Sequence, residues 1–206
     1  MDDFNNNSIN TLVVEATPEH TDTAFQEEPN LKKELWADAI SWGKTIVFAV
    51  IFALIINNFI IVNASVPTGS MEGTIRVNDR IIALRLSYLF SEPSTYDIVV
   101  FRGPDDASIL YVKRIIGVPG DEIIIRSGEV YINGSEIPQR NNFVQGELFG
   151  NFGPYIVPEG HFFMLGDNRG NSVDSRHWPS TFVPRENILG QVVLRYFPGF
   201  RVLSNT

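Results

Sequence analysis

The chain of 206 residues contains no cysteine and only three histidines, His20, His161 and His177. Without cysteine it can form neither a disulfide framework nor a thiolate metal site, and a zinc site built on histidines would be hard to assemble. Lysine is scarce too, because Lys113 is the only lysine among the thirteen basic residues that follow Val62. A buried lysine can lose its proton, whereas arginine keeps it. Apart from histidine, Lys113 is therefore the only nitrogen base available after Val62.

A basic excess is also missing from the part that follows Val62. The formal net charge of the chain is −8, and residues 63–206 carry fifteen acidic against thirteen basic residues. This balance argues against a nucleic-acid partner. Residues 1–44 carry nine acidic residues and three lysines. We expect a disordered tail to about residue 30 and a short amphipathic helix over residues 31–44.

Residues 45–62 form an uncharged, largely apolar run of eighteen residues. Its length favours a transmembrane anchor, although a buried helix of a soluble protein and a cleaved signal peptide remain alternatives. Lys32, Lys33 and Lys44 precede the run, and the next basic residue is Arg76. The positive-inside rule then predicts a single-pass protein of the cell membrane, with a cytoplasmic N-terminus and residues 63–206 outside.

Short segments rich in Ile, Val, Phe and Tyr, separated by turn signals, predict β-structure after the anchor. The expected strands are Arg80–Leu86, Ile98–Arg102, Ile109–Gly117, Glu122–Arg126, Glu129–Asn133, His161–Leu165 and Ile188–Phe197. Ser127-Gly128 and Asn133-Gly134 predict tight hairpin turns, and Gln139–Pro158 predicts a long loop. We therefore expect a mainly β, antiparallel, barrel-like or sandwich domain with a small inserted hairpin region at about residues 122–160.

Three segments could carry chemistry, and each also has a plainer interpretation. The turn Val66–Thr74 presents Ser70, but could be an ordinary linker. Lys113 lies in an apolar strand where it or Arg114 must face apolar neighbours, although strand lysines usually point to solvent. The polar loop Gly166–Arg176 could be a solvated turn. Its two acids and two arginines instead predict internal pairing that holds Ser172 in place. These residues are Asp167, Asp174, Arg169 and Arg176.

Together, these segments resemble the signature boxes of bacterial type I signal peptidases, in that family's order. The matching boxes are Ser70-Met71-x-x-Thr74, Asp97-Ile98-Val99-Val100-Phe101, Tyr111-Val112-Lys113-Arg114-Ile115-Ile116-Gly117-x-Pro119-Gly120-Asp121 and Gly166-Asp167-Asn168-Arg169-x-Asn171-Ser172-x-Asp174-Ser175-Arg176. The resemblance spans roughly residues 35–198. Gly73 replaces a usual proline, Tyr96 a usual glycine, and Thr68 a frequent serine.

The resemblance implies a membrane-anchored serine endopeptidase that removes signal peptides by cleaving after small residues of the Ala-x-Ala type. It implies Ser70 as nucleophile, Lys113 as general base, Ser172 as the group that orients Lys113, and Thr68 with the Ser70 N–H as the oxyanion hole. Asp174 and Arg176 would brace their loop. Substrate pockets would be lined by Val66, Pro67, Met71, Ile75, Tyr111 and Val112.

The same resemblance implies preproteins as substrates, contact with membrane lipid, association with the export machinery, and no metal or cofactor. Ser70 follows Val62 by eight residues, so it lies at most about 28 Å from the membrane surface. Three alternatives remain: a non-enzymatic membrane-anchored β-domain that binds exported peptides, a self-cleaving Ser-Lys regulator, and a Ser-His-Asp hydrolase that uses His161 or His177. The regulator would need a DNA-binding domain, for which residues 1–44 are acidic and short.

Overall fold

The computed structural model of the protein describes residues 31–136, 138–139, 142–147 and 149–203. The tail predicted to about residue 30 lies outside this part. Residues Ile46–Thr206 form one compact unit, and the chain up to Thr45 belongs to another.

One long helix, α1 (Leu31–Ile55), continues as a π-helical turn, Ile56–Ile60. Its stretch Asp38–Ile60 has a mean hydropathy of 2.2, which makes it apolar and long enough to cross a membrane, and no other described helix meets that test. The single N-terminal apolar helix is thus confirmed. None of its most apolar stretch is buried in the protein, which contradicts the alternative of a core helix. The helix also ends before Val62, because Ile61 already begins a strand.

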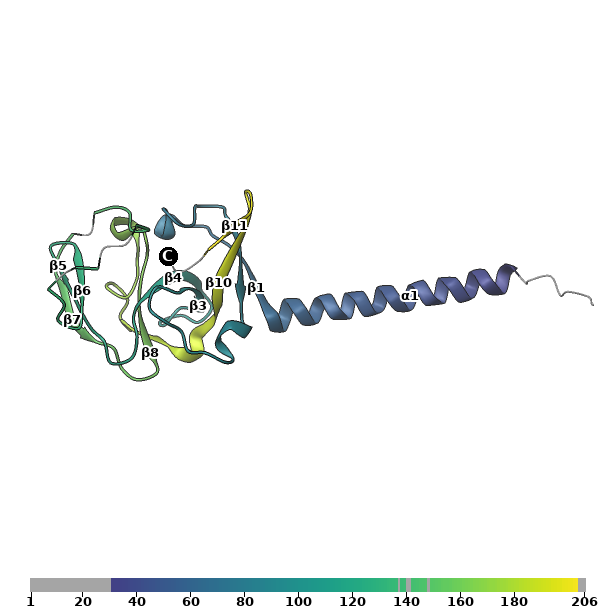
Figure 1. Ribbon diagram of the computed structural model, residues 1–206, viewed down its shortest axis with the longest axis horizontal. Coiled ribbons are helices and arrows are strands. Elements are labelled where there is room, and N and C mark those ends of the chain that lie inside the picture. Colours follow the sequence, from purple (N-terminus) through teal and green to yellow (C-terminus); the bar gives the residue numbers. More distant parts are fainter. Residues whose placement is uncertain (1–30, 137, 140–141, 148, 204–206) are drawn as a thin grey trace, which may run out of the picture. The chain divides into compact units, whose positions relative to one another are not determined.

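Antiparallel strands form two sheets in the rest of the described chain (Figure 1). The larger sheet has the order β1-β2-β10-β3-β4-β8-β9, with β11 paired to β10. Its strands are β1 (Ile61–Ser65), β2 (Arg80–Leu84), β3 (Ile98–Arg102), β4 (Leu110–Gly117), β8 (His161–Leu165), β9 (Val183–Pro184), β10 (Ile188–Phe197) and β11 (Arg201–Val202). The smaller sheet has the order β6-β5-β7, with β5 (Glu122–Arg126), β6 (Glu129–Ile132) and β7 (Phe152–Ile156). The predicted mainly β, antiparallel fold class is confirmed.

The predicted long loop Gln139–Pro158 is wrong in its second half, where β7 pairs with β5. The sequence pattern does not indicate this strand, because it contains Gly153 and Pro154 and both residue types are depleted in strands. The structure tolerates them because β7 lies at an edge of its sheet, where a missing N–H costs no ladder bond. The tight turn at Ser127-Gly128, with φ of +48° and +82°, joins β5 to β6 as predicted.

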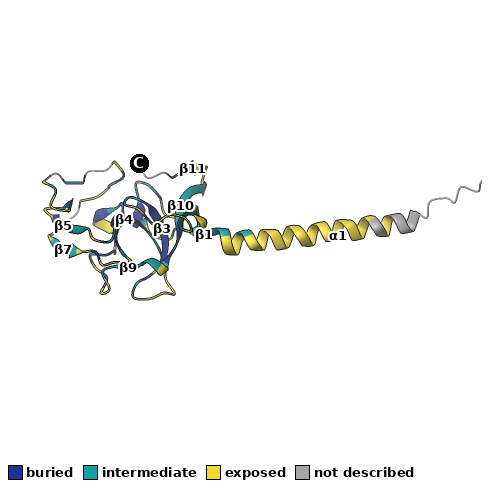
Figure 2. Ribbon diagram, turned by 60° about the horizontal axis from the view of Figure 1, so that its bottom comes forward, coloured by how far each residue is buried: buried dark blue, intermediate teal, exposed yellow. Residues whose placement is uncertain are grey.

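Buried apolar residues follow the strands and fix the segments that carry the predicted site (Figure 2). Met71 and Ile75 are fully buried and pack with Val62, Ile81 and Val100 under the larger sheet. Met71 is the last residue of the short 3-10 turn Gly69–Met71, which carries Ser70, and Ile75 follows four residues later. Burial of two such side chains stabilises by about 3–6 kcal/mol, so this turn is a fixed part of the core.

Candidate active site

Ser70 and Lys113 meet inside the domain. The Lys113 Nζ donates a hydrogen bond to the Ser70 Oγ at 2.5 Å. Both residues are buried, with exposures of 3 % for Lys113 and 7 % for Ser70. Lys113 stands in the middle of β4, opposite Val99 of β3, and Ser70 is held by its 3-10 turn. Two segments 43 residues apart thus bring a hydroxyl and an amine into direct contact.

Burial sets the protonation of Lys113. Removal from water disfavours the charged ammonium and lowers the pKa of Lys113 to about 8, although the carboxylates of Asp174 and Asp167 oppose this. No described carboxylate lies within ion-pair distance of the Nζ. The amine can therefore be neutral near physiological pH and act as a base.

Arg114, the next residue of β4, is fully buried and is paired with a carboxylate. Its guanidinium donates to both carboxylate oxygens of Asp167, at 2.8 and 2.7 Å, and to the Tyr96 carbonyl at 2.8 Å. Its Cζ also lies 3.6 Å from the centre of the Phe143 ring. Both cations of the strand are thus buried, on opposite faces, and only Arg114 has a counter-ion.

The prediction that the loop Gly166–Arg176 pairs internally is correct for one pair and wrong for the other. Arg176 donates to Asp174 at 2.7 and 2.8 Å, as expected. Asp167 instead binds Arg114 and accepts a hydrogen bond from Thr74 at 2.6 Å. The Arg169 Nε donates to the Gly166 carbonyl. The loop is therefore tied to β4 and to the nucleophile segment.

Ser172 lies beside Ser70, but the expected hydrogen bond to Lys113 is absent. Its Oγ is buried and has no hydrogen-bond partner among the described residues. A methyl group at Gly166 would lie 2.3 Å from this Oγ and 2.4 Å from the Ser70 carbonyl oxygen. Only glycine fits there, so Gly166 is a site residue that sequence reasoning missed. The Lys113 amine hydrogen-bonds to the Ser70 Oγ instead.

An active-site groove of about 570 Å³ lies over Ser70 and Lys113. Val66, Pro67, Tyr111 and Val112 line it as predicted, and Thr68 places its Oγ1 3.5 Å from the Ser70 Oγ. Met71 and Ile75 do not line it, because their side chains are fully buried in the core. The lining residues that the sequence analysis missed are Asn63, Ala64, Ser65, Gly69, Val100, Ile109, Leu110, Asn171 and Val173.

Gln145, also missed, joins the inserted region to the nucleophile segment. It pairs with Asn168, its N–H donates to the Asp167 carbonyl at 2.8 Å, and its carbonyl accepts from the Arg169 N–H at 2.7 Å. Gly73 has a φ of +104°, and a methyl group there would lie 2.9 Å from the Gln145 side chain. The glycine that departs from the family pattern therefore fits a backbone conformation that proline cannot adopt.

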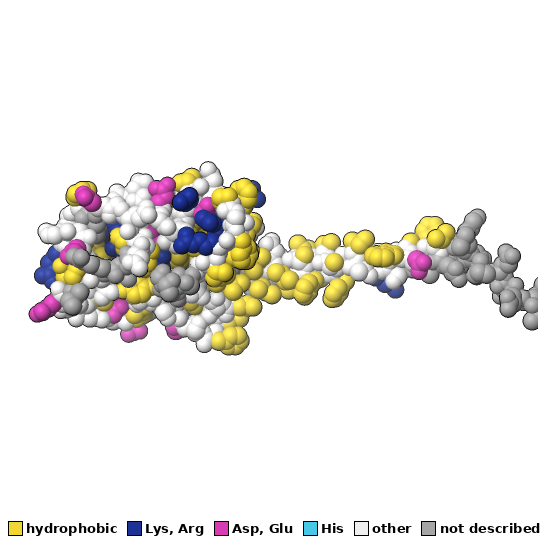
Figure 3. Space-filling model, turned by 45° about the horizontal axis from the view of Figure 1, so that its top comes forward, with side chains coloured by type: hydrophobic (Ala, Val, Ile, Leu, Met, Phe, Trp, Pro, Cys, Tyr) yellow, Lys and Arg dark blue, Asp and Glu magenta, His cyan; other side chains and the backbone are white. Residues whose placement is uncertain are grey.

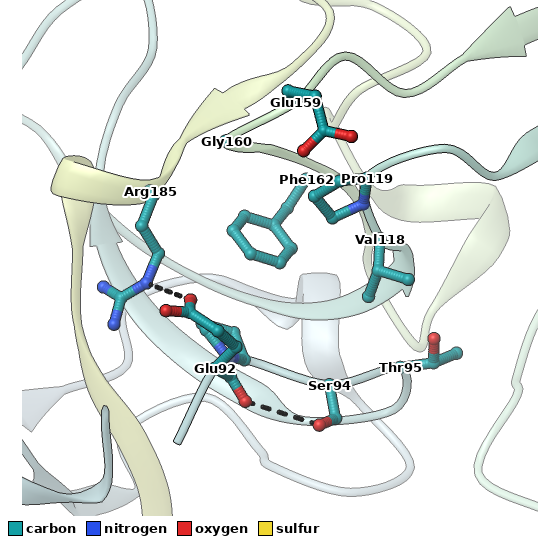
Figure 4. A pocket seen from close by; sticks show the side chains of 10 residues that line it. Glu92, Ser94, Thr95, Val118, Pro119, Glu159, Gly160, Phe162 and Arg185 are labelled. Atoms are coloured by element: carbon teal, nitrogen blue, oxygen red, sulfur yellow. Dashed lines mark hydrogen bonds and ion pairs between the residues drawn. The ribbon is translucent and has the colours of Figure 1, made fainter. Parts of the chain in front are cut away.

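A separate pocket of about 600 Å³ shares no lining residue with the groove (Figure 4). Arg185 and Glu92 form an ion pair of 2.9 Å at its wall, and Phe162 points into it. Neither described histidine hydrogen-bonds to Ser70 or Lys113. The described hydrogen bonds join His161 to the Glu159 carbonyl, and His177 lies 3.9 Å from Asp174. The Ser-His-Asp alternative thus finds no support.

Comparison with known proteins gives a consistent picture. Residues 39–197 match the family described as signal peptidase, peptidase S26. The chain is 41% identical over 165 residues to probable signal peptidase I-2 of Synechocystis sp., covering 78% of this chain and 74% of that protein. It is 35% identical over 167 residues to signal peptidase I T of Bacillus subtilis, covering 77% and 86%. A crystal structure of a signal peptidase I from Enterococcus faecalis is 31% identical and matches with a TM-score of 0.37, covering 49% and 97%.

Substitution of Gly73 tests the fit between this turn and Gln145. Gly73→Ala and Gly73→Pro should each destabilise the fold by more than about 1 kcal/mol, since neither residue accepts the positive φ. For a chain of this size, each kcal/mol lowers the Tm by about 2–4 °C. Gly120→Ala is the matched control, because Gly120 also has a positive φ but open space around it. It should cost only the backbone strain, so the larger loss of Tm in Gly73→Ala measures the contact with Gln145. A Gly73→Pro protein with unchanged Tm would show that the turn does not hold this conformation.

Proposed function

The chain belongs to the peptidase S26 family of signal peptidases, and on this premise we propose that Ser70 and Lys113 carry out the hydrolysis by which it removes signal peptides from preproteins. The observation that carries the proposal is the 2.5 Å contact between the two side chains in a buried site. A domain that only binds peptides has no use for a buried amine with a lowered pKa held against a serine. The enzymatic reading is therefore preferred over the binding module.

Neutral Lys113 accepts the proton of the Ser70 hydroxyl as the Oγ attacks the carbonyl carbon of the scissile bond. The C–N bond then breaks, and the Lys113 ammonium returns the proton to the leaving amine. Water next attacks the acyl-enzyme ester and loses its proton to Lys113. The ester C–O bond then breaks, the signal peptide leaves with a new carboxyl group, and the Lys113 ammonium returns the proton to the Ser70 Oγ. Each cycle consumes one water molecule and leaves the amine as it began.

The Thr68 hydroxyl and the Ser70 N–H are proposed to bind the oxyanion that forms in both steps. Loss of one such donor typically lowers the rate by roughly 10²–10³-fold. The position of the Thr68 Oγ1 at 3.5 Å from the nucleophile supports this role. Ser172 is proposed as a positioning residue for Lys113, and the Asp174–Arg176 pair as the brace of its loop.

The groove is suited to an extended peptide. β1 is an edge strand, and the first residues of β4 pair only with β3, because pairing with β8 begins at Arg114. Both strands thus present free backbone edges to the groove, which can hydrogen-bond a substrate strand. Val66, Pro67 and Val112 give it shallow apolar walls, which supports a preference for small Ala-x-Ala side chains.

Hydrophobic side chains cover the helix (Figure 3), which is long and apolar enough to cross a membrane, and we infer that it anchors the enzyme there. We assign the helix to the cell membrane with the N-terminus cytoplasmic, because Lys32, Lys33 and Lys44 all precede its apolar stretch and no basic residue follows it until Arg76. The Arg85 N–H donates to the carbonyl of Ile60, the last residue of the span, at 2.9 Å. Leu89 and Phe90 follow closely with exposures of 64 % and 95 %, so they are proposed to contact lipid. A site at this boundary lies beside the export machinery that delivers preproteins.

Loss of either reacting group should abolish processing. Ser70→Ala removes the nucleophile, and Lys113→Arg replaces the base with a side chain that stays charged. In detergent, each variant should cleave a preprotein at least about 10³-fold more slowly than wild type. Sequencing of the new N-terminus identifies the bond. Thr45→Ala is a control remote from the groove, and full activity of either dyad variant would overturn the proposed mechanism.

The pH profile should follow Lys113. With a pKa of about 8, the neutral fraction is roughly a tenth at pH 7 and nine tenths at pH 9. Since the neutral amine is the active form, kcat/KM should rise about tenfold over this range. A profile that is flat from pH 7 to 9, or that falls as the pH rises, would assign the base to another group.

Single-cysteine variants, free of background because the chain has no cysteine, test the orientation and the lipid contact. A spin label at Phe90→Cys in lipid vesicles should be more accessible to oxygen than to a water-soluble nickel complex, and the exposed polar control Glu136→Cys should show the reverse. In whole cells, a membrane-impermeant maleimide should reach Glu136→Cys from outside. Labelling only after lysis contradicts the orientation, and equal nickel access contradicts the lipid contact.

A further inference from the structure

A second hollow adjoins the active-site groove across the loop that carries Ser172. We name it the exit hollow. It measures about 330 Å³, and its lining includes Glu147, Phe149, Phe152, Asn171, Val173 and His177. Asn171 and Val173 line the groove as well, so the two depressions meet along these residues. The surface over Ser70 is therefore continuous from β1 to the inserted region.

The direction in which a bound preprotein runs along this surface follows from the positions of the groove, Ser70 and the exit hollow. The groove begins at Asn63, three residues beyond the last residue of the span, and follows the chain to Ser70. The Asn168 N–H donates to the Ser70 carbonyl at 3.0 Å, which fixes the next loop beside the nucleophile. β1 and β7 lie at opposite sides of the domain (Figure 1). A signal peptide in the bilayer reaches β1 first, so the chain beyond the scissile bond leaves toward the exit hollow.

The chemistry of the exit hollow suits a peptide with an apolar side chain. Phe149 and Val173 are apolar, with exposures of 76 % and 62 %. The Phe152 ring is fixed edge-on against His177, with centroids 6.0 Å apart, and the charge of Arg176 is neutralised by Asp174. Ser172 also lines the hollow, but its Oγ is buried. Polar residues such as Glu147 and Asn171 share the lining, and the exposed apolar surface comes from Phe149 and Val173.

Resting on the proposed function, we propose that the exit hollow binds the first residues of the mature chain, those that follow the scissile bond. Phe149 and Val173 contact an apolar side chain of that segment. The enzyme thereby reads sequence on both sides of the bond it cuts. Phe149 is a binding residue outside the reacting groups, so its loss weakens binding without altering the chemistry.

The test compares two substrates on the full-length enzyme in detergent. Both carry the same signal segment with an Ala-x-Ala end; one stops at the first mature residue, and the other continues for about ten residues, or about 35 Å when extended. Wild type should cleave the longer peptide with the higher kcat/KM. Phe149→Ser should lower kcat/KM for the longer peptide roughly fivefold, mostly through KM, and leave the shorter one unchanged.

Phe200→Ser is the matched control, because Phe200 is exposed to 75 % and lines neither the groove nor the exit hollow. It should change neither substrate, and Phe149→Leu should retain most of the preference for the longer peptide. Equal losses on both peptides, or no loss on either, overturn the assignment of the hollow while leaving the peptidase intact. A wild-type enzyme that cleaves neither peptide would instead refute the proposed function.

Discussion

Two basic residues, Lys113 and Arg114, stand next to each other in β4, and the site depends on the different partners that their side chains have. Successive side chains of a strand point to opposite faces, so Lys113 and Arg114 never share surroundings. Arg114 donates hydrogen bonds to both carboxylate oxygens of Asp167 and has a structural role. Lys113 hydrogen-bonds to the Ser70 hydroxyl and has no counter-ion among the described residues. If their partners were exchanged, the lysine would be locked as an ammonium and the guanidinium would be left buried and unpaired, which typically costs several kcal/mol.

Much of this arrangement could be predicted from the sequence where the signal is local. Short runs rich in Ile, Val, Phe and Tyr between turn signals predict strands such as Ile98–Arg102 and Ile188–Phe197, and the motif boxes indicate Ser70 and Lys113. Contacts over long distances are different. Asp167 has arginines nearby in its own loop, yet binds one 53 residues away, because only the fold places β4 beside it. Met71 and Ile75 were expected to line the groove, but which face of a turn is buried is decided by packing.

The inserted region also supports the catalytic loops. The segment from Phe143 to Gln145 covers Arg114 with an aromatic ring and pairs with the loop that follows β8. Gly73 and Gln145 then fit each other closely, since the space that a side chain at position 73 would fill is occupied. A departure from the family pattern at one residue is thus matched by a contact from a distant segment. Substitutions at either position act on the other.

The first strand begins at Ile61, directly after the last residue of the apolar helix, with no flexible stalk between them. A catalytic domain on a long flexible linker samples a large volume, so its effective concentration at a substrate in the same membrane is low. Here the search is confined to a thin layer above the bilayer. Two membrane-bound molecules then meet by lateral diffusion alone, and height becomes a criterion of selection. On the proposed mechanism, a susceptible bond must have suitable neighbouring residues and must also lie at the same height above the bilayer as Ser70.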